Sequence, residues 1–544
     1  MTVSSDGSDA VGKSNGSGTA VLVVGAGPTG LLLAAELQRR GVAFHLIDSR
    51  TAPMHWDRAT VVHPRSLQIF ESLGLGRKFL DAGCRQRLIK IHSNGELLGK
   101  MELSSCGSAY GFNVGLSEEV TESILTEYLE RSGGIVNRGS RLVGLVQRGD
   151  GVLAEIEHDG QCHQINARWV VGCDGVHSPT RETTNIAFEG HDIVKPWAVF
   201  DATLAGWTDT YEGNFVYFGE HPTIFTAIPG HRWRVYLRPS SAESDLVEDA
   251  TAVLRVYAPG ASFVDVENPT RFHCATKIAK HYRSGAVFLA GDAAHLCSPA
   301  QGHGMNCGLQ DAFNLAWKMA LVYHGDAGAE LLNSYEAERR PAAELVAHSG
   351  DEFENALTMT NPAGCDARDQ AIRAMIADPT ARQHEIVAET ELNVVYSGSP
   401  IIEGEGNSSL AAGQRLPDQI AVRRPDRQEC RLHELAHRAG HTLILLTGPA
   451  ADASEVVDLH AALQRVAAES SVFEAAVGLS SVRDLSAAIG YLEPAAAALL
   501  GVQGSMLLAV RPDGYVGLRA DQGHLGALER YRTLVSGTQP NAQV

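Results

Sequence analysis

The chain has 544 residues, of which 44% are hydrophobic and 20% are charged, as in ordinary soluble globular proteins. Lys and Arg number 45 against 64 Asp and Glu, so the net charge is −19 and the surface repels nucleic-acid phosphates and anionic lipid. We therefore expect no nucleic-acid or membrane partner and a cytoplasmic location. The nine cysteines contain no CxxC pair, which disfavours a disulfide scaffold and a metal site, so no metal is expected.

The first elements after a Ser/Gly-rich N-terminal segment predict a β-α-β unit. The apolar run AVLVV is followed by the turn GAGPTG, the helical stretch LLLAAELQRRG and a second apolar run, VAFHLI, which ends at Asp48. The turn has the G-x-G-x-x-G pattern between a strand and a helix, with an acid at the end of the next strand. This context, unlike the glycine pattern alone, indicates a site for an adenine dinucleotide.

The residues of this turn have separate physical roles. Gly25 permits the tight turn, Gly27 lets a pyrophosphate approach the backbone, and Gly30 lets the helix pack on the strand. Pro28 suits the first helical turn, whose unpaired N–H groups face the phosphates, and Asp48 can accept a hydrogen bond from a ribose hydroxyl. The motif by itself does not distinguish FAD from NAD.

Two later strands end in turns of the same kind. RWVVGCDG ends near Asp174, and AVFLAGDAAH ends near Asp292. Ligands of open α/β sheets bind at the carboxyl ends of the strands, so we expect these turns to lie together. Asp292 is suited to accept a hydrogen bond from a flavin ribityl hydroxyl, and the N–H groups of residues 302–306, at a helix start, can receive negative charge from an isoalloxazine ring.

The rest of the chain changes character twice. Residues 185–284 alternate apolar and polar positions and are rich in aromatics, as in NFVYFGEHPTIFTAIPGHRWRVYLRP, which predicts an inserted antiparallel sheet. Residues 357–411 carry Pro, Gly and Asp breaks without a sustained period, so we expect a connector. From Leu432 onward the strands HTLILLTG and SMLLAVRPDG predict a separate C-terminal domain.

Several segments, in this order, carry a family resemblance: GAGPTG, RATVVHPRSLQIFESLGLG, EEVTESIL, VVGCDGVHSPTR, GDAAH through WKMA, and SYEAERRP. They resemble the single-component FAD-dependent aromatic hydroxylases, flavoprotein monooxygenases of the p-hydroxybenzoate and phenol hydroxylase type, over roughly Val21 to Pro341. The resemblance implies an α/β fold with a Rossmann-like FAD-binding domain and an inserted antiparallel-sheet substrate domain. The stretches LHELAHRAGHTLILLTG and LLAVRPDGYVGLRAD resemble the thioredoxin-like C-terminal domain of the phenol hydroxylase branch, here without CxxC.

These expectations divide the chain into six segments. They are a disordered tail (1–18), the first part of the FAD-binding domain (19–184), the substrate-binding β-sheet domain (185–284), the second part of the FAD-binding domain with helices (285–356), the connector (357–411) and the thioredoxin-like domain (412–544). Cys430 has no CxxC partner, so a structural or dimer-forming role is expected for the last domain, and a homodimer is compatible with the sequence.

The resemblance also implies roles for single residues. It places Asp174 near FAD and the nicotinamide cofactor, Arg58 near the FAD phosphates and Leu142 near the adenine. Glu118 stands where the family commonly has a Gln that contacts FAD, and a shift of one residue would put Ser117 there instead. The predicted cofactor-binding residues are Gly25, Gly27, Pro28, Thr29, Gly30, Asp48, Ser49, Arg50, Arg58, Glu118, Leu142, Asp174, Asp292, Pro299, Gly302, Gly304, Met305 and Asn306.

The resemblance implies the reaction as well. NADPH or NADH reduces FAD, O₂ adds at the flavin C4a, and the hydroperoxide transfers oxygen to an activated aromatic ring of a phenolic or polyketide-type substrate, as in secondary metabolism. Pro299 and His303 are the predicted catalytic residues; His303 and Gln301 replace a commoner Gln and Gly in the loop near the ring. The predicted substrate residues are Tyr217, Phe225, Arg234, Tyr236 and Pro299.

A phenolic substrate would benefit from a general base or hydrogen-bond acceptor. The candidates are His295, His303, Tyr217, Arg234 and Tyr236, although such residues are more often packed and hydrogen-bonded than catalytic. Two other functions stay open: Baeyer-Villiger-type or epoxidising oxygen insertion on a polycyclic natural product, and FAD binding without catalysis.

Overall fold

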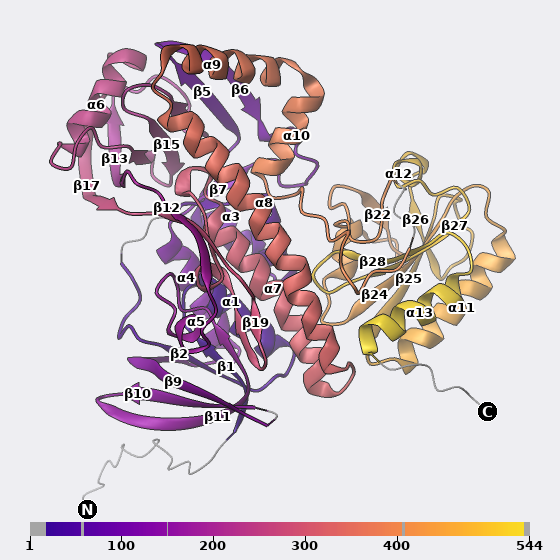
Figure 1. Ribbon diagram of the computed structural model, residues 1–544. Helices are drawn as coiled ribbons and strands as arrows, with labels where there is room; N and C mark the ends of the chain where they lie inside the picture. The colour runs from indigo at the N-terminus through magenta and orange to yellow at the C-terminus, as the bar shows by residue number, and fades with distance from the viewer. Residues whose placement is uncertain (1–17, 56–58, 150, 405–408, 538–544) are drawn as a thin grey trace, which may run out of the picture.

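A computed structural model describes residues 18–55, 59–149, 151–404 and 409–537. Residues 1–17 of the predicted tail, together with Arg58, lie outside the described residues. Figure 1 shows an α/β layer around β1 and α7, a second sheet above it beside α6 and α9, and a C-terminal domain at the side. The mixed α/β fold predicted from the sequence is confirmed.

The first large sheet carries the predicted β-α-β unit. β1, β2, β11 and β20 are parallel, in the order β20-β11-β1-β2. Its central strand β1 is almost wholly buried, as expected for a parallel strand covered on both faces. The strands are β1 (Thr19–Val24), β2 (Phe44–Asp48), β8 (Val136–Arg138), β9 (Ser140–Arg148), β10 (Gly151–His158), β11 (Gln161–Gly172), β19 (Arg283–Ser284) and β20 (Val287–Leu289).

Helices and small sheets cover this layer. Helix α1 (Pro28–Arg39) packs against α7 (His303–His324), and both are apolar along most of their length. The other helices of this part are α2 (Pro64–Ser72), α3 (Gly76–Ala82), α4 (Glu118–Arg131) and α5 (Pro179–Thr183). The small sheets comprise β3 (Val61–Val62), β4 (Cys84–Gln86) and β7 (Asn113–Gly115), and β12 (Phe188–Asp192), β18 (Ala275–Ala279) and β21 (His295–Leu296).

The second large sheet differs in two ways from the inserted domain expected over residues 185–284. Strands β5 and β6 come from the earlier segment, and β5 pairs in parallel with β14. A helix, α6 (Leu246–Tyr257), covers one face of the sheet. In sheet order the strands are β17 (Ser262–Phe272), β13 (Trp197–Ala205), β16 (Arg232–Leu237), β15 (Thr223–Ile228), β14 (Gly213–Tyr217), β5 (Leu88–Ser93) and β6 (Glu96–Glu102).

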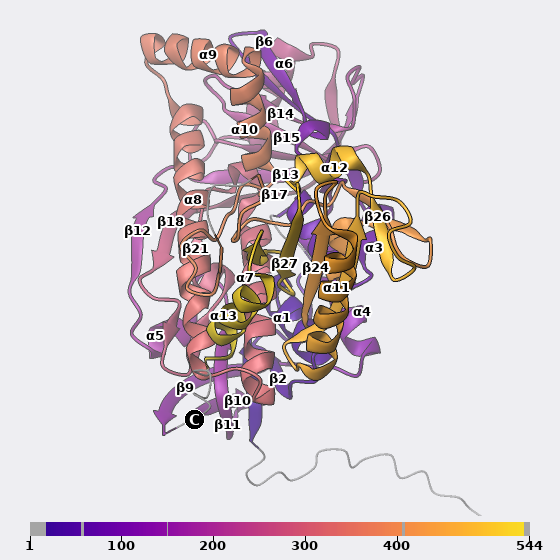
Figure 2. The ribbon, with the colours of Figure 1, turned by 90° about the vertical axis from the view of Figure 1, so that its right-hand side faces the viewer.

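The segment expected to be a connector over residues 357–411 is instead helical over much of its length. The long helix α8 (Asn333–Thr358) is followed by α9 (Pro362–Ala377) and α10 (Pro379–Glu389), which lie against β6 at the end of the second sheet (Figures 1 and 2). Both prolines occupy the first helical position, where a missing N–H costs nothing, and Asn361 and Asp378 cap the helices with their side chains. The residues that suggested breaks are therefore helix starts.

The C-terminal domain is a mixed sheet with helices. Its strand order is β23-β22-β26-β25-β24-β27-β28, with β24, β25 and β26 parallel. Its assignment as thioredoxin-like stays a prediction. The elements are β22 (Ala421–Arg423), β23 (Glu429–Arg431), β24 (His441–Thr447), α11 (Ala453–Glu469), β25 (Phe473–Ser480), β26 (Ile489–Leu492), α12 (Pro494–Leu499), β27 (Ser505–Val510), β28 (Val516–Ala520) and α13 (His524–Ser536).

A buried charged network joins this domain to the first layer. Arg511 donates to both carboxylate oxygens of Glu338 on α8, at 2.6 and 2.8 Å, and to Asp513 at 2.6 Å. Lys318 on α7 donates to Glu338 at 2.7 Å. The contact of this domain with α7 and α8 thus contains fully buried ion pairs. Within the described residues, we find no helix with both the length and the apolar character needed to cross a bilayer.

Candidate active site

The predicted dinucleotide turns meet at one edge of the first sheet. The G-x-G-x-x-G turn follows β1, Asp48 ends β2, Asp174 follows β11, and the 3₁₀ turn Gly291–Ala293 with Asp292 follows β20. Because these strands are parallel neighbours, their carboxyl ends lie side by side. The edge has the geometry of a ligand site in an open α/β sheet.

The glycines of the first turn are required by close backbone approach. Gly25 has φ +102°, and a Cβ there would lie 2.3 Å from the carbonyl oxygen of Cys173. A Cβ on Gly30 would lie 1.9 Å from the carbonyl oxygen of Gly25. Gly27 is the N-cap of α1 without a side-chain cap, so the first N–H groups of the helix, from Thr29 onward, face the edge. This cradle fits a pyrophosphate group.

Asp48 also shapes the turn that it was predicted to accompany. Its carboxylate accepts the N–H of Ala26 at 2.7 Å and the N–H of Arg50 at 2.8 Å. Burial opposes ionisation of Asp48, but the hydrogen bonds from Arg50 and Ala26 outweigh it and lower its pKa. The guanidinium of Arg50 lies 3.2 Å from Asp48, whereas Ser49 is exposed. The Asp48 carboxylate is therefore ionised and held in a fixed orientation at the site.

Asp174 has its own set of partners. Its carboxylate accepts hydrogen bonds from the hydroxyls of Ser178 and Thr180 and from the N–H of Thr180, at 3.0 Å for the last. Burial raises its pKa, and these hydrogen bonds act in the opposite direction. Leu142, predicted near the adenine, is buried in β9 and packs in the cluster that contains Ile47. Asp174 thus holds the turn after β11 through Ser178 and Thr180.

Ser117 and Glu118, the two alternatives left by the sequence, both lie at the start of α4. Ser117 is the N-cap of α4, and its hydroxyl accepts the N–H of Val120 at 3.4 Å. Glu118 is the first residue of the helix and is partly buried. A contact of either side chain with FAD stays a prediction.

The loop before α7 brings the predicted flavin-ring residues together. Pro299–Gln301 forms a 3₁₀ turn, Gly302 has φ +72°, and Gly304 and Met305 lie in the first turn of α7. Asn306 accepts the N–H of His63 at 3.0 Å and donates to the carbonyl of Val61 at 2.8 Å, which fixes the loop to β3. Thr29 of α1 lies against Gly291, where a Cβ would approach its hydroxyl to 2.7 Å. The helix start, the loop and the edge of the sheet fit an extended flavin dinucleotide.

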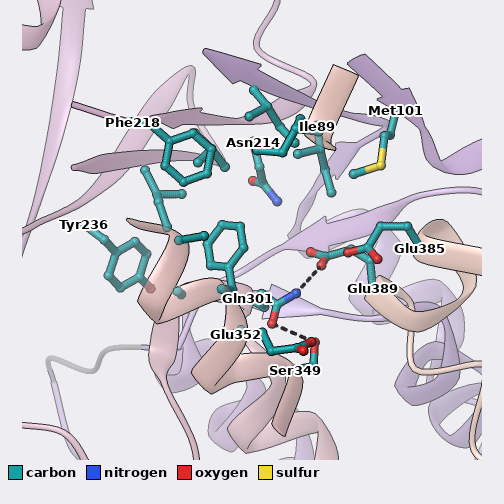
Figure 3. A pocket seen from close by; sticks show the side chains of 18 of the residues that line it. Ile89, Met101, Asn214, Phe218, Tyr236, Gln301, Ser349, Glu352, Glu385 and Glu389 are labelled. Atoms are coloured by element: carbon teal, nitrogen blue, oxygen red, sulfur yellow. Dashed lines mark hydrogen bonds between the residues drawn. The ribbon is translucent and has the colours of Figure 1, made fainter. Parts of the chain in front are cut away.

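A cavity of about 280 Å³ lies beside this loop. The second sheet forms one wall, α8, α9 and α10 form the other, and Pro299, Gln301 and Gly302 reach it from the loop. Figure 3 shows Phe218, Asn214 and Ile89 above the cavity and Gln301 and Ser349 below. The apolar wall on the sheet is made by Ile89, Ile91, Met101, Val216, Phe218 and Ile224.

The structure corrects three of the predicted substrate residues. Tyr217 and Phe225 point to the opposite face of the sheet, into the core under α6, because strand residues alternate between faces. Arg234 is buried and forms a two-armed ion pair with Asp201, at 2.7 and 2.9 Å, and does not line the cavity. Tyr236 and Pro299 do line it, and the Tyr236 hydroxyl lies 2.9 Å from that of Thr60.

Two buried histidines near the loop are engaged elsewhere. His295 lies 2.6 Å from Asp311, which also pairs with Arg339, so it is not a base facing the cavity. His303 lies 2.9 Å from Glu391; burial opposes its protonation, but Glu391 outweighs it and raises the pKa of His303. Glu391 itself adopts φ +55°, a conformation that non-glycine residues seldom hold without a local reason.

Sequence reasoning missed the acidic end of the cavity. Glu385 and Glu389 of α10 line it, and the amide of Gln301 donates to Glu389 at 3.2 Å (Figure 3). Burial raises the pKa of Glu389 to about 7, while His303 opposes the shift. The available signal was the pair Asp378-Pro379 as a helix start, which puts residues 385 and 389 on one helix face.

Comparisons with known proteins agree with the site. The model of the FAD binding domain family matches residues 18–349. The chain is 31% identical over 458 residues to a pentachlorophenol 4-monooxygenase of Sphingobium chlorophenolicum, covering 81% of this chain and 82% of that protein. It is 33% identical over 422 residues to a 6-methylpretetramide 4-monooxygenase of Streptomyces rimosus, covering 75% of each.

A solved structure extends the likeness to nearly the whole chain. The ternary complex of aklavinone-11 hydroxylase with FAD and aklavinone superposes with a TM-score of 0.75 at 26% identity, covering 96% of this chain and 99% of that one. The chain belongs to the family of FAD-dependent aromatic hydroxylases, as the sequence motifs predicted.

Proposed function

We propose that the protein is an FAD-dependent monooxygenase that hydroxylates a fused-ring phenol, with O₂ and NADPH or NADH as cosubstrates. The relatives named above act on a chlorinated phenol or on polyketides. We take the reaction class from these relatives and infer the substrate class from the cavity.

The observation that carries the proposal is the cavity next to the Pro299–Gly302 loop. A cavity of about 150 Å³ holds a single benzene ring. The volume of about 280 Å³ leaves room for two or three fused rings. Its wall on the sheet side is largely apolar, and Asn214, Gln301 and three glutamates add polar groups, as expected for a flat aromatic ligand with a few polar substituents.

The residues of this chain have three tasks in such a reaction. The Gly25–Gly30 turn and Asp48 hold the dinucleotide, Asp292 receives the ribityl chain, and the cavity excludes water and orients the ring. By family resemblance, the bound flavin would supply oxygen transfer through a C4a-hydroperoxide after its reduction by NAD(P)H. In this proposal Pro299 and His303 position the reactants.

The test follows oxidation of NADPH and NADH by the FAD-loaded protein. We expect hydroxyanthraquinones and naphthols to stimulate oxidation and to gain one oxygen atom, and matched polycyclic ketones without a hydroxyl to do neither. Oxygen insertion into the ketones would favour the Baeyer-Villiger alternative. Failure of every aromatic compound to stimulate oxidation would leave a protein that binds FAD without catalysis and would refute the proposal.

A variant pair separates the flavin site from the sheet. Asp292→Ala should weaken FAD binding about ten- to a hundredfold, the range expected for a lost hydrogen bond to a charged group. Tyr217→Phe, on the far face of the sheet, should leave FAD binding and turnover unchanged. Flavin fluorescence titration measures the first effect. Wild-type FAD affinity in Asp292→Ala would contradict its ribityl role.

A further inference from the structure

Two glutamates give one end of the cavity a carboxylate surface. Glu385 and Glu389 stand four residues apart in α10, so they share a face of the helix, and both line the cavity. Figure 3 shows their carboxylates next to Gln301, opposite the apolar side chains of the sheet. One end of the cavity thus carries two carboxyl groups, beside the loop that carries Pro299.

Glu389 is buried but holds few partners. It is 9% exposed, and Gln301 donates to it at 3.2 Å. The hydroxyl of Ser349 donates to the amide oxygen of Gln301 at 3.2 Å, which turns the amide nitrogen toward Glu389. In the described part of the chain no Lys or Arg forms an ion pair with Glu389. A carboxylate with spare acceptor positions therefore faces the cavity.

Charged groups from every neighbouring element affect this carboxyl. Glu385 on α10 and Glu391 after it add negative charge, His303 on α7 adds positive charge, and Glu352 on α8 lies at the cavity edge. The guanidinium of Arg368 on α9 is taken up by Asp369 and Ser93. Burial, helped by Glu385, raises the pKa of Glu389 to about 7 against the effect of His303. The group therefore exchanges a proton near neutral pH.

We propose that Glu389 is the base that accepts the proton of the substrate's ring hydroxyl. The O–H bond breaks, its electron pair stays on the ring oxygen, and the carboxylate becomes a carboxylic acid. The resulting phenolate pushes electron density into the ring, which then reacts with an electrophilic oxygen. The proton returns to solvent when the product leaves. The assignment rests on the proposed hydroxylation of a phenol.

Tyr236 and Asn214, which line the cavity, and His303, which does not, are less suited to this step. The Tyr236 hydroxyl is hydrogen-bonded to Thr60, and the Asn214 amide has no basic atom. His303 is paired with Glu391, which also accepts a hydrogen bond from Gln310. His303 and Glu391 set the charge around Glu389 and act as positioning residues.

The kinetic test uses the FAD-loaded enzyme with 2-hydroxyanthraquinone, whose colour changes on ionisation. In Glu389→Gln, kcat near neutral pH should fall about a hundredfold or more, the usual contribution of a general base. Activity should return toward that of the wild type at alkaline pH, where 2-hydroxyanthraquinone ionises without help. Glu389→Asp should recover part of the loss at neutral pH, and Glu344→Gln, on the exposed face of α8, should match the wild type.

The binding test needs no turnover. The wild-type protein with oxidised FAD should bind 2-hydroxyanthraquinone as its phenolate at a pH at which Glu389→Gln binds it as the neutral phenol, as the visible spectrum shows. An unchanged spectrum and pH profile in Glu389→Gln would overturn the proposal. Equal loss of 2-hydroxyanthraquinone binding in Glu389→Gln and Glu389→Asp would also overturn it, because the residue would then serve binding alone.

The two measurements keep the two proposals apart. If no hydroxylated aromatic stimulates NAD(P)H oxidation by the wild type, the proposed function fails, yet the spectrum of bound 2-hydroxyanthraquinone still decides whether Glu389 accepts the proton. If wild-type turnover is found but is insensitive to Glu389→Gln, the function stands and the base is another group.

Discussion

Two sets of buried carboxylates in this protein have opposite surroundings. Where the C-terminal domain meets α7 and α8, Glu338 is paired with Arg511 and Lys318, and Asp513 is paired with Arg511, all at 2.6 to 2.8 Å. Glu389, at the cavity, accepts a hydrogen bond from the amide of Gln301. Both sets are buried, so they differ in whether Lys or Arg side chains pair with them and not in burial.

The electrostatic consequence is a separation of pKa values. Burial would raise the pKa of Glu338, but Arg511 and Lys318 outweigh it and hold the pKa far below its usual range. Burial lowers the pKa of Lys318 to about 8, with Glu338 opposing the shift. Burial raises that of Glu389 to about 7. A fully paired carboxylate stabilises an interface, whereas an unpaired one in a cavity is suited to move protons.

The largest expected effect comes from taking the cation away from the interface. Arg511→Met leaves Glu338 and Asp513 buried with only part of their positive charge, so we expect a loss of about 3–5 kcal/mol in the free energy of unfolding. Urea denaturation followed by far-UV circular dichroism measures it, with flavin fluorescence reporting on the first domain. The control is Arg532→Met, which removes an exposed pair with Glu529. A loss in Arg511→Met no larger than in the control would break the comparison.

An intermediate effect is expected from pH. The folded pKa of Glu389, about 7, lies above its ordinary value of 4.5, so the folded state binds the extra proton between these values. Stability should therefore fall as pH rises from about 4.5 to about 7, by up to about 3 kcal/mol. Glu389→Gln should remove this slope.

Glu338 provides the matched contrast. Its pKa is lowered, so its stabilisation is present above about pH 4.5 and is lost only in stronger acid. Unfolding free energies of the wild type, Glu389→Gln and Glu338→Gln, measured from about pH 7 down into the acid range below about pH 4.5, should show the two signs. A parallel pH dependence of the wild type and Glu389→Gln would show that Glu389 titrates normally.

The nucleotide edge of the fold could be predicted from sequence because its signals are local. Gly25, Gly30 and Asp48 lie within one β-α-β unit, and each is required by a turn or contact that the pattern itself specifies. Asp174 and Asp292 followed from the rule that parallel strands end at the same edge. The order of the motifs along the chain then indicated that the dinucleotide is a flavin cofactor.

The cavity could not be predicted in the same way because its parts meet only in the tertiary structure. Strand alternation separates Val216 from Tyr217 but does not say which side faces a ligand, since both faces of the sheet are covered and apolar. The pairing of β5 with β14 joins residues far apart in the chain. Glu389 lay in a segment in which proline was interpreted as a break, although Pro379 starts the helix.

The smallest effect is expected at a second, wetter contact with the C-terminal domain. Glu71 of α2 pairs with Arg431 and lies 2.9 Å from His433, in the 3₁₀ turn Leu432–Ala436, with the Glu71 side chain 21% exposed. Burial opposes the ionisation of Glu71, but His433 and Arg431 lower its pKa to about 2. Its stabilisation is therefore present above about pH 4.5 and lost as pH falls toward about 2.

Because solvent screens this contact, Glu71→Gln should cost no more than about 1 kcal/mol at neutral pH, against several for Arg511→Met. The same urea titration measures both, and Lys78→Met, which removes an exposed pair with Glu127, sets the background. Cations are available at both interfaces, so this pair of variants isolates the contribution of burial. Equal losses in Glu71→Gln and Arg511→Met would mean that pairing alone, irrespective of water, decides what a carboxylate contributes in this molecule.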